Sequence, residues 1–121
     1  MSVTRRKVLI VDDNPDAVAI LTIMLKRAGH ETYHAVNGSE ALALARRLRP
    51  DFVFLDIGLP QINGLEVARE LRRDPGFAGV RIIAISGLGQ ETVRKEAQDA
   101  GFDQYLVKPI DLAFVESLLG H

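Results

Sequence analysis

Hydrophobic residues along the chain fall into two kinds of segment that alternate. Five short runs are rich in β-branched, aromatic and other apolar residues, at 7–11, 31–36, 52–55, 81–85 and 104–107. After each run, apolar residues recur at helical spacing, which predicts helices that include residues 17–28, 41–48, 65–71, 91–100 and 112–119. Strict alternation of strand and helix predicts a parallel sheet with helices on both faces.

The composition of each run predicts its place in the sheet. The runs KVLIV, FVFL and RIIAI are nearly all apolar, as expected for strands buried on both faces. The run ETYHAV mixes polar and apolar residues, which suits an edge. Gly29 and Gly101 mark helix ends, and Asp111 is the expected N-cap of the last helix. We expect one α/β domain over residues 1–121, with no output domain.

Composition narrows the classes of protein to which the chain can belong. It has 121 residues, 47% hydrophobic and 26% charged, with a net charge of −1 and no cysteine. The near-neutral balance argues against a general nucleic-acid binder, and the lack of cysteine excludes thiol chemistry and disulfides. No apolar run approaches the ~20 residues that span a bilayer, and no signal peptide is evident. We therefore expect a cytoplasmic protein without membrane contact.

Polar residues that can carry chemistry follow the ends of the predicted strands. Ligands of an open parallel sheet bind beyond the carboxyl ends of its strands, where the strand order reverses. In a doubly wound, flavodoxin-like sheet of order 2-1-3-4-5, that point lies between the first and third strands. The side chains expected to meet at this edge are Asp12, Asp13, Asp56, Ser86 and Lys108.

Three carboxylates gathered in one place need compensating positive charge. Two like charges about 4 Å apart repel by ~4 kcal/mol at an effective dielectric constant near 20. A hard cation such as Mg²⁺, which prefers oxygen ligands, relieves this repulsion, and Lys108 supplies a second positive charge. A carboxylate beside both cations is suited to accept a phosphoryl group, with Ser86 as a hydrogen-bond donor to the phosphoryl oxygens.

Each of these residues also has a purely structural interpretation. Asp12 and Asp13 can serve as a helix N-cap with first-turn acids. Asp56 can be a turn residue, Ser86 a loop serine, and Lys108 with the following proline a turn pair. That all five residues fall at the same edge of the sheet by chance is less favoured than a common functional site.

The sequence resembles the receiver domain of two-component response regulators over nearly its whole length. The resemblance rests on four segments in the order and spacing of that family: VDDN at 11–14, LDIGLPQING at 55–64, AISG at 84–87 and YLVKP at 105–109. It implies that Asp56 is the phosphoacceptor. It also implies that Mg²⁺, or Mn²⁺, is bound by Asp13, Asp56 and the backbone carbonyl of Gly58, with Asp12 acting mainly through water.

The same resemblance assigns roles around the phosphoryl group. Lys108 would contact the phosphoryl group, and its peptide bond to the structural residue Pro109 would be cis. Ser86 and Gly87 would also contact it, and we expect a bulky side chain at position 87 to crowd the acceptor. Ser86 and Tyr105 match a switch pair in which the hydroxyl moves to the phosphoryl group and the ring turns inward. Gly64 fits the turn that opens the third helix.

The resemblance implies a phosphorylation-activated switch in a phosphorelay, whose donor is a sensor histidine kinase or a histidine phosphotransfer protein. Such a protein is not a conventional enzyme and catalyses only its own phosphorylation and dephosphorylation. Its target would bind the face of the fourth helix, fifth strand and fifth helix, and the chain would be a monomer or a weak, phosphorylation-linked dimer. Segments DIGLP and ISGLGQE particularly resemble receivers of hybrid sensor kinases. The alternative is a receiver-like binding module that works without phosphorylation, which the intact set of acids, serine and lysine disfavours.

Other features favour structural interpretations. The segment Gly87-Leu88-Gly89 lacks the third glycine of a dinucleotide-binding loop. The histidines at 30, 34 and 121 show no metal-ligand spacing and are expected at the surface or on an edge strand. The arginine clusters at 46–49 and 69–73 are expected on solvated helix faces, with some ion pairing.

Overall fold

Five parallel strands form one sheet in the order β2-β1-β3-β4-β5, as the sequence predicted. The structure, a computed structural model, describes residues 5–57, 63–87 and 91–119. The strands are β1 (Lys7–Val11), β2 (Glu31–Ala35), β3 (Phe52–Asp56), β4 (Arg81–Ser86) and β5 (Gln104–Val107). The polar run ETYHAV lies at an edge as β2, because only a strand covered on both sides must be apolar throughout.

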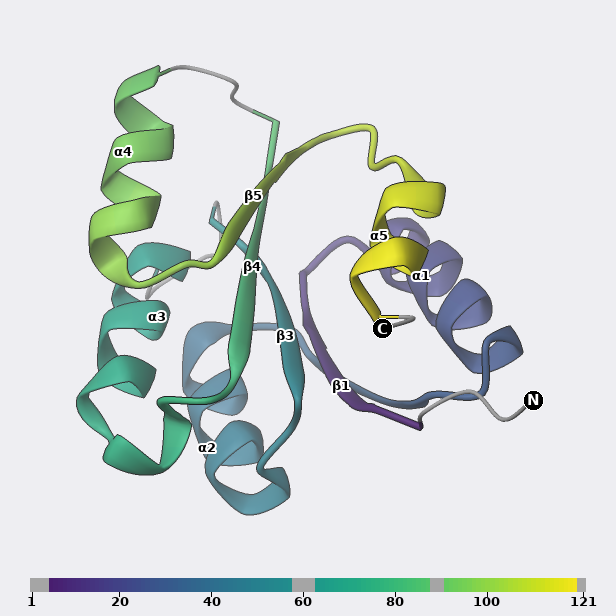
Figure 1. The fold of residues 1–121 in the computed structure, drawn as a ribbon, viewed down its shortest axis with the longest axis horizontal. Coiled ribbons are helices and arrows are strands. Elements are labelled where there is room, and N and C mark those ends of the chain that lie inside the picture. Colours follow the sequence, from purple (N-terminus) through teal and green to yellow (C-terminus); the bar gives the residue numbers. More distant parts are fainter. Residues whose placement is uncertain (1–4, 58–62, 88–90, 120–121) are drawn as a thin grey trace.

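Helices cover both faces of the sheet (Figure 1). Two helices lie on one face: α1 (Pro15–Arg27) and α5 (Leu112–Leu119). The other face carries α2 (Gly38–Leu48), α3 (Gly64–Arg73) and α4 (Glu91–Ala100). A 3₁₀ helix, η1 (Pro75–Phe77), follows α3 where the sequence indicated only a helix end. It forms because Asp74 accepts a hydrogen bond from the backbone N–H of Gly76 and Pro75 fits the first position.

The alternation of side chains along each strand produces two separate cores. In β1, Val8 and Ile10 point toward α1 and α5, whereas Leu9 and Val11 point toward the other face. The core on the α1 and α5 face also contains inward residues of these two helices, namely Val18, Leu21, Leu25, Val115 and Leu119. The core on the opposite face contains inward residues of α2, α3 and α4, namely Ala41, Ala45, Val67, Ala68, Leu71 and Ala97.

Helix capping decides between two interpretations of the acids after β1. Asn14 is the N-cap of α1, and its side chain accepts hydrogen bonds from the N–H groups of Asp16 and Ala17, at 2.9 and 3.4 Å. The structural interpretation of Asp12 and Asp13 as the cap is therefore wrong. Asp111 caps α5 as predicted, and accepts a hydrogen bond from the N–H of Ala113 at 3.0 Å.

Two expectations about surface residues need correction. His30 is buried rather than exposed: only 6% of it is accessible, and its Nδ1 accepts a hydrogen bond from the N–H of Arg6. Arg72 is not on a solvated face but donates to several backbone carbonyls. The exposed neighbours Arg69 and Arg73 do form the predicted ion pairs, with Glu66 and Glu70. Among the described residues, no helix is long and apolar enough to cross a membrane.

Candidate functional site

The carboxyl edge of the sheet brings together residues that are far apart in the sequence. Asp12 directly follows β1, Asp56 is the last residue of β3, and Ser86 is the last residue of β4. Lys108 directly follows β5, and its backbone N–H donates to the carbonyl of Ser86 at 2.8 Å. Parallel pairing aligns these strand ends, so all the predicted chemistry-bearing residues meet at one edge.

Three carboxylates form the centre of this site. One carboxylate oxygen each from Asp12, Asp13 and Asp56 lies within 4.8 Å of the others. Asp12 and Asp56 are buried, with 2% and 8% of each residue accessible, while Asp13 is exposed. The cluster therefore has two carboxylates held by the fold and a third open to solvent. All-oxygen ligation of this kind suits Mg²⁺, so the three acids could hold a metal ion.

Lys108 provides the positive charge of the site. Its Nζ lies 3.4 Å from Oδ2 of Asp56 and 3.7 Å from Oδ2 of Asp12. The ammonium group thus touches both buried carboxylates, while a third of its side chain remains accessible. It can stay within reach of a group bound to Asp56.

Asp12 is electrostatically frustrated in this arrangement. Burial raises the pKa of its carboxyl above the usual value, and the nearby charge of Asp56 raises it further. A hydrogen bond from the backbone N–H of Asn14, at 2.9 Å, and the charge of Lys108 act in the opposite direction. Because burial is the largest influence, ionised Asp12 is destabilised unless more positive charge arrives.

Gly64 lies against the end of β3, the strand that carries Asp56. The sequence indicated it only as a turn residue. Its N–H donates to the carbonyl of Ile57 at 3.0 Å. A Cβ at this position would lie 2.5 Å from the carbonyl oxygen of Asp56, closer than side chains tolerate. Gly64 therefore allows the start of α3 to touch the backbone of the phosphoacceptor candidate. By contrast, a Cβ at Gly87 meets no atom within 4 Å among the described residues, which gives no support to the expected crowding there.

The remaining predicted site residues have mixed positions. Ser86 is buried at the end of β4, and the Lys108-Pro109 bond is cis, as the resemblance implied. Tyr105 pairs with Ala84 in the sheet and is half-buried, with the guanidinium carbon of Arg94 4.8 Å from its ring centre. Gly58, expected to supply a backbone carbonyl, lies outside the described residues.

The structure also adds His34, which sequence reasoning did not place here. Its Nε2 lies 3.0 Å from the backbone carbonyl oxygen of Asp12, in hydrogen-bond contact. The contact arises because β2 pairs in parallel with β1 and aligns His34 with Ile10, two residues before Asp12. The strand register was the missing information, since the histidine and the aspartate are 22 positions apart.

Comparison with known proteins identifies relatives of similar sequence. The family model of the response regulator receiver domain matches residues 8–119. The chain is 38% identical to protein PilH of Pseudomonas aeruginosa, over 87% of both chains. It is 33% identical to the polar-differentiation response regulator DivK of Brucella anthropi, over 93% of both. It is also 38% identical to the transcriptional regulator RpaA of Synechocystis but spans only 48% of that longer protein.

Solved structures agree in fold. The chemotaxis response regulator CheY4 of Vibrio cholerae matches with a TM-score of 0.89 and 28% identity, over 95% of this chain and 97% of CheY4. The receiver domain of sensor histidine kinase PA1611 from Pseudomonas aeruginosa, solved with a magnesium ion in its active site cleft, matches at 0.87 and 29%, over 96% and 95%.

A third match comes from a co-crystal of the Saccharomyces cerevisiae histidine phosphotransfer protein Ypd1 with the receiver domain of the response regulator Ssk1. Its TM-score is 0.88 and its identity 26%, over 98% of this chain and 89% of the matched chain. Both the sequence match to the family model and the structural matches thus cover nearly the whole chain. This chain belongs to the response regulator receiver domain family.

Proposed function

We propose that this chain is a phosphorylation-activated switch that accepts a phosphoryl group on Asp56 from a phosphohistidine of a kinase or phosphotransfer protein. One observation carries the proposal: Asp56 lies at the end of a buried strand, with Lys108 at 3.4 Å and two further carboxylates within 4.8 Å. An acid used only for capping or in a turn has no need of a lysine and two acidic neighbours.

The chemical step follows from this arrangement. A carboxylate oxygen of Asp56 attacks phosphorus, a P–O bond forms, and the P–N bond to the donor imidazole breaks. The imidazole leaves with the electron pair of that bond and takes a proton from solvent. Lys108 neutralises charge on the phosphoryl oxygens, and Ser86 donates a hydrogen bond to one of them. Mg²⁺, bound by Asp12, Asp13 and Asp56, would supply further charge neutralisation.

Two similar proteins support the proposed metal ion and the proposed class of phosphoryl donor. The PA1611 receiver domain carries magnesium in its active site cleft, and Ssk1 forms a complex with Ypd1. The fold of this chain is similar to those two receiver domains, and its own acidic cluster could hold a metal ion, so we expect the same ion and the same class of donor. The chain would then catalyse only its own phosphorylation and dephosphorylation.

The output would pass through the surface of α4, β5 and α5. A hollow of about 480 Å³ between α4 and β5 is lined by Arg94, Gln98, Phe102 and Tyr105, among others. Tyr105 lines this hollow and lies on β5, which pairs with β4, the strand that ends at Ser86. A movement of Ser86 toward a phosphoryl group can therefore alter the exposed surface. The partner that reads this surface would be another protein.

Intact-mass spectrometry after incubation with acetyl phosphate and Mg²⁺ tests the proposal. We expect one phosphoryl group on the wild-type chain and none on Asp56→Asn, which keeps the size of the side chain but removes the nucleophile. Asp99→Asn, at an exposed position on α4, is the matched control and should be phosphorylated like the wild type.

Two results would contradict the proposal. One is an unmodified wild-type chain under conditions that phosphorylate a known receiver domain, which would favour a phosphorylation-independent binding module. The other is an adduct that persists in Asp56→Asn, which would place the acceptor elsewhere.

A further inference from the structure

Asp12 is tied to the edge strand β2 through both of its backbone groups. Its N–H donates to the carbonyl of Ala35 at 3.1 Å, and its own carbonyl oxygen lies 3.0 Å from Nε2 of His34. The first contact joins backbone to backbone, whereas the second uses a side chain. β2 therefore restrains the chain on both sides of the Asp12 α-carbon.

The side chain of His34 continues a connection that the two backbones have ended. β1 and β2 pair as far as Val11 and Ala35, and the chain then turns toward α2. The carbonyl of Asp12 thus lies beyond the paired part of the two strands. His34 pairs with Ile10, so its ring lies on the same side of the sheet as α1, which begins shortly after Asp12. From this position the ring reaches one residue past the last backbone pair.

The contact between His34 and Asp12 can have only one direction. A carbonyl oxygen accepts hydrogen bonds and cannot donate one, so Nε2 of His34 must carry the hydrogen. A neutral histidine ring carries a single hydrogen, on either Nδ1 or Nε2. The contact therefore selects the Nε2–H tautomer of the neutral ring, which is a measurable property.

This hydrogen bond also restrains Asp13. The carbonyl of Asp12 and the N–H of Asp13 belong to one planar peptide unit, so a bond that fixes the carbonyl also fixes how the chain enters Asp13. Asp13 is exposed, so packing restrains it little, yet one of its carboxylate oxygens lies within 4.8 Å of those of Asp12 and Asp56. The backbone must therefore present this carboxylate to the site.

We propose that His34 is a positioning residue of the acidic site: its Nε2–H orients the peptide unit between Asp12 and Asp13, and so presents both carboxylates to one divalent cation. His34 would not touch the cation and acts only through these two residues. The inference rests on the proposed function, which supplies the cation. Hydrogen-bond partners of metal ligands commonly change metal affinity by about 10- to 100-fold when they are replaced.

NMR titration with Mg²⁺ alone is the first measurement, on the wild type, His34→Leu and His34→Gln. Leucine removes the donor, whereas glutamine offers an amide N–H at a similar reach. We expect His34→Leu to weaken Mg²⁺ binding about tenfold and His34→Gln to stay within about threefold of the wild type. A side chain that only filled space would not be replaced by glutamine better than by leucine.

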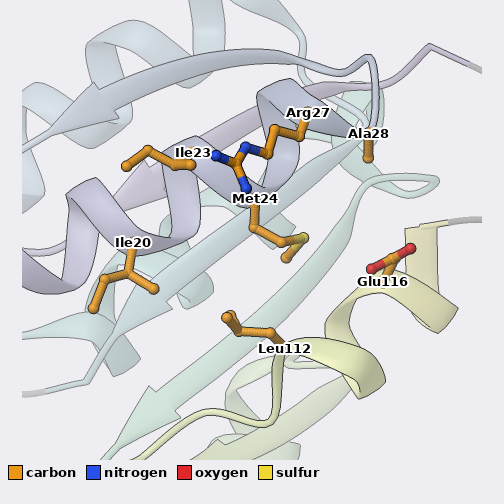
Figure 2. A pocket seen from close by; sticks show the side chains of 7 residues that line it. All are labelled: Ile20, Ile23, Met24, Arg27, Ala28, Leu112 and Glu116. Carbon is orange, nitrogen blue, oxygen red and sulfur yellow. The ribbon is translucent and has the colours of Figure 1, made fainter.

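Two control variants separate positioning from a general loss of stability. Thr32→Ala removes a β-branched side chain from β2, two positions before His34 and so on the same side of the sheet. Met24→Ala loosens α1, because this side chain packs against the core and lies between α1 and α5 along a groove of about 500 Å³ (Figure 2). Both variants should lower the free energy of unfolding in EDTA and leave the affinity for Mg²⁺ unchanged.

The dependence of phosphorylation on Mg²⁺ gives a second readout. His34 places two acids but takes no part in bond formation at Asp56. With acetyl phosphate, His34→Leu should therefore need about tenfold more Mg²⁺ for its half-maximal rate and should reach nearly the wild-type rate at saturation. A variant that was merely misfolded would instead lose rate at every concentration of Mg²⁺.

The ¹⁵N NMR signals of the His34 ring in mildly alkaline solution test the contact itself, and we expect the hydrogen on Nε2. A hydrogen on Nδ1, an unchanged Mg²⁺ affinity in His34→Leu, or an equal loss of affinity in Thr32→Ala or Met24→Ala would overturn the inference. A wild type that binds no Mg²⁺ would overturn it as well. The proposed function fails on a different result, the absence of a phosphoryl adduct on the wild type, so the two failures are distinguishable.

Discussion

At the scale of single residues, the acidic site is a compromise between stability and function. Asp12 is almost fully buried beside Asp56, and burial raises its pKa above the usual value. Its ionised form is compensated only in part by the ammonium of Lys108, at 3.7 Å, and by the N–H of Asn14. The proposed Mg²⁺ site therefore carries unbalanced negative charge when no cation is bound.

This imbalance predicts the effect of Asp12→Asn. Because the folded state raises the pKa of Asp12, ionisation at pH 7 lowers the stability of the metal-free protein. The amide removes the charge and keeps an oxygen that can accept the hydrogen bond from Asn14. We expect the free energy of unfolding without metal to rise by about 0.5–2 kcal/mol and the affinity for Mg²⁺ to fall.

Urea unfolding with EDTA and titration with Mg²⁺ measure these two effects separately. Asp99→Asn, an exposed acid outside the site, is the control and should change neither quantity. A loss of stability in metal-free Asp12→Asn would show that Asp12 is not strained by its surroundings.

Residue types and spacing were sufficient to predict most of this site. Asp12, Asp56, Ser86 and Lys108 meet because each follows or ends a strand, and strand ends can be predicted from apolar runs. The roles of Gly64 and His34 could not be predicted, since both depend on contacts between elements. Gly64 touches the backbone of Asp56, and His34 reaches Asp12 only through the register of β2 with β1.

At the scale of elements, Arg72 joins the end of α3 to three other segments. Its Nε donates to the carbonyl of Gly101 at 2.9 Å, and one terminal nitrogen donates to the carbonyls of Phe77 and Val80 at 2.7 and 2.8 Å. The other terminal nitrogen pairs with Asp103 at 2.8 Å. One side chain thus connects η1, the start of β4 and the turn between α4 and β5.

We expect Arg72→Ala to lower the free energy of unfolding by about 2–4 kcal/mol, because several carbonyls and Asp103 lose a charged donor at once. Arg73→Ala is the matched control. It removes only an exposed ion pair with Glu70 and should cost less than about 1 kcal/mol. Denaturant unfolding of both variants makes the comparison, and equal losses would contradict the connecting role.

The sequence could not distinguish these arginines. Arg69, Arg72 and Arg73 all fall on a polar helix segment, and periodicity alone places them in solvent. Arg72 differs because η1 and the α4–β5 turn pack over the end of α3 and bring free carbonyls within its reach.

At the scale of the whole molecule, stability should depend on pH through His30. Burial is the main reason why the pKa of this side chain is lowered, and the charge of Arg6 adds to the effect. Its Nδ1 accepts a hydrogen bond from Arg6, which requires an unprotonated nitrogen. The group therefore contributes its full stability above its usual pKa of about 6.5, and this contribution is lost as the pH falls toward the lower pKa of the folded state.

Urea unfolding of the wild type and of His30→Gln, between about pH 7.5 and pH 5, measures this contribution. The glutamine can accept a hydrogen bond but does not titrate. We expect the wild type to lose stability relative to the variant as the pH falls below about 6.5. A constant difference between the two proteins across this range would exclude His30 as the cause.

The order of strands and helices, the edge position of β2 and the residues of the acidic site could all be predicted from the amino-acid sequence. These follow from local properties, namely side-chain periodicity, the polarity of each run and the residues at strand ends. Tertiary structure decided the burial of His30, the connections of Arg72, the contact of Gly64 with Asp56 and the groove between α1 and α5. Each depends on which elements pack together, and that requires distances between residues remote in the sequence.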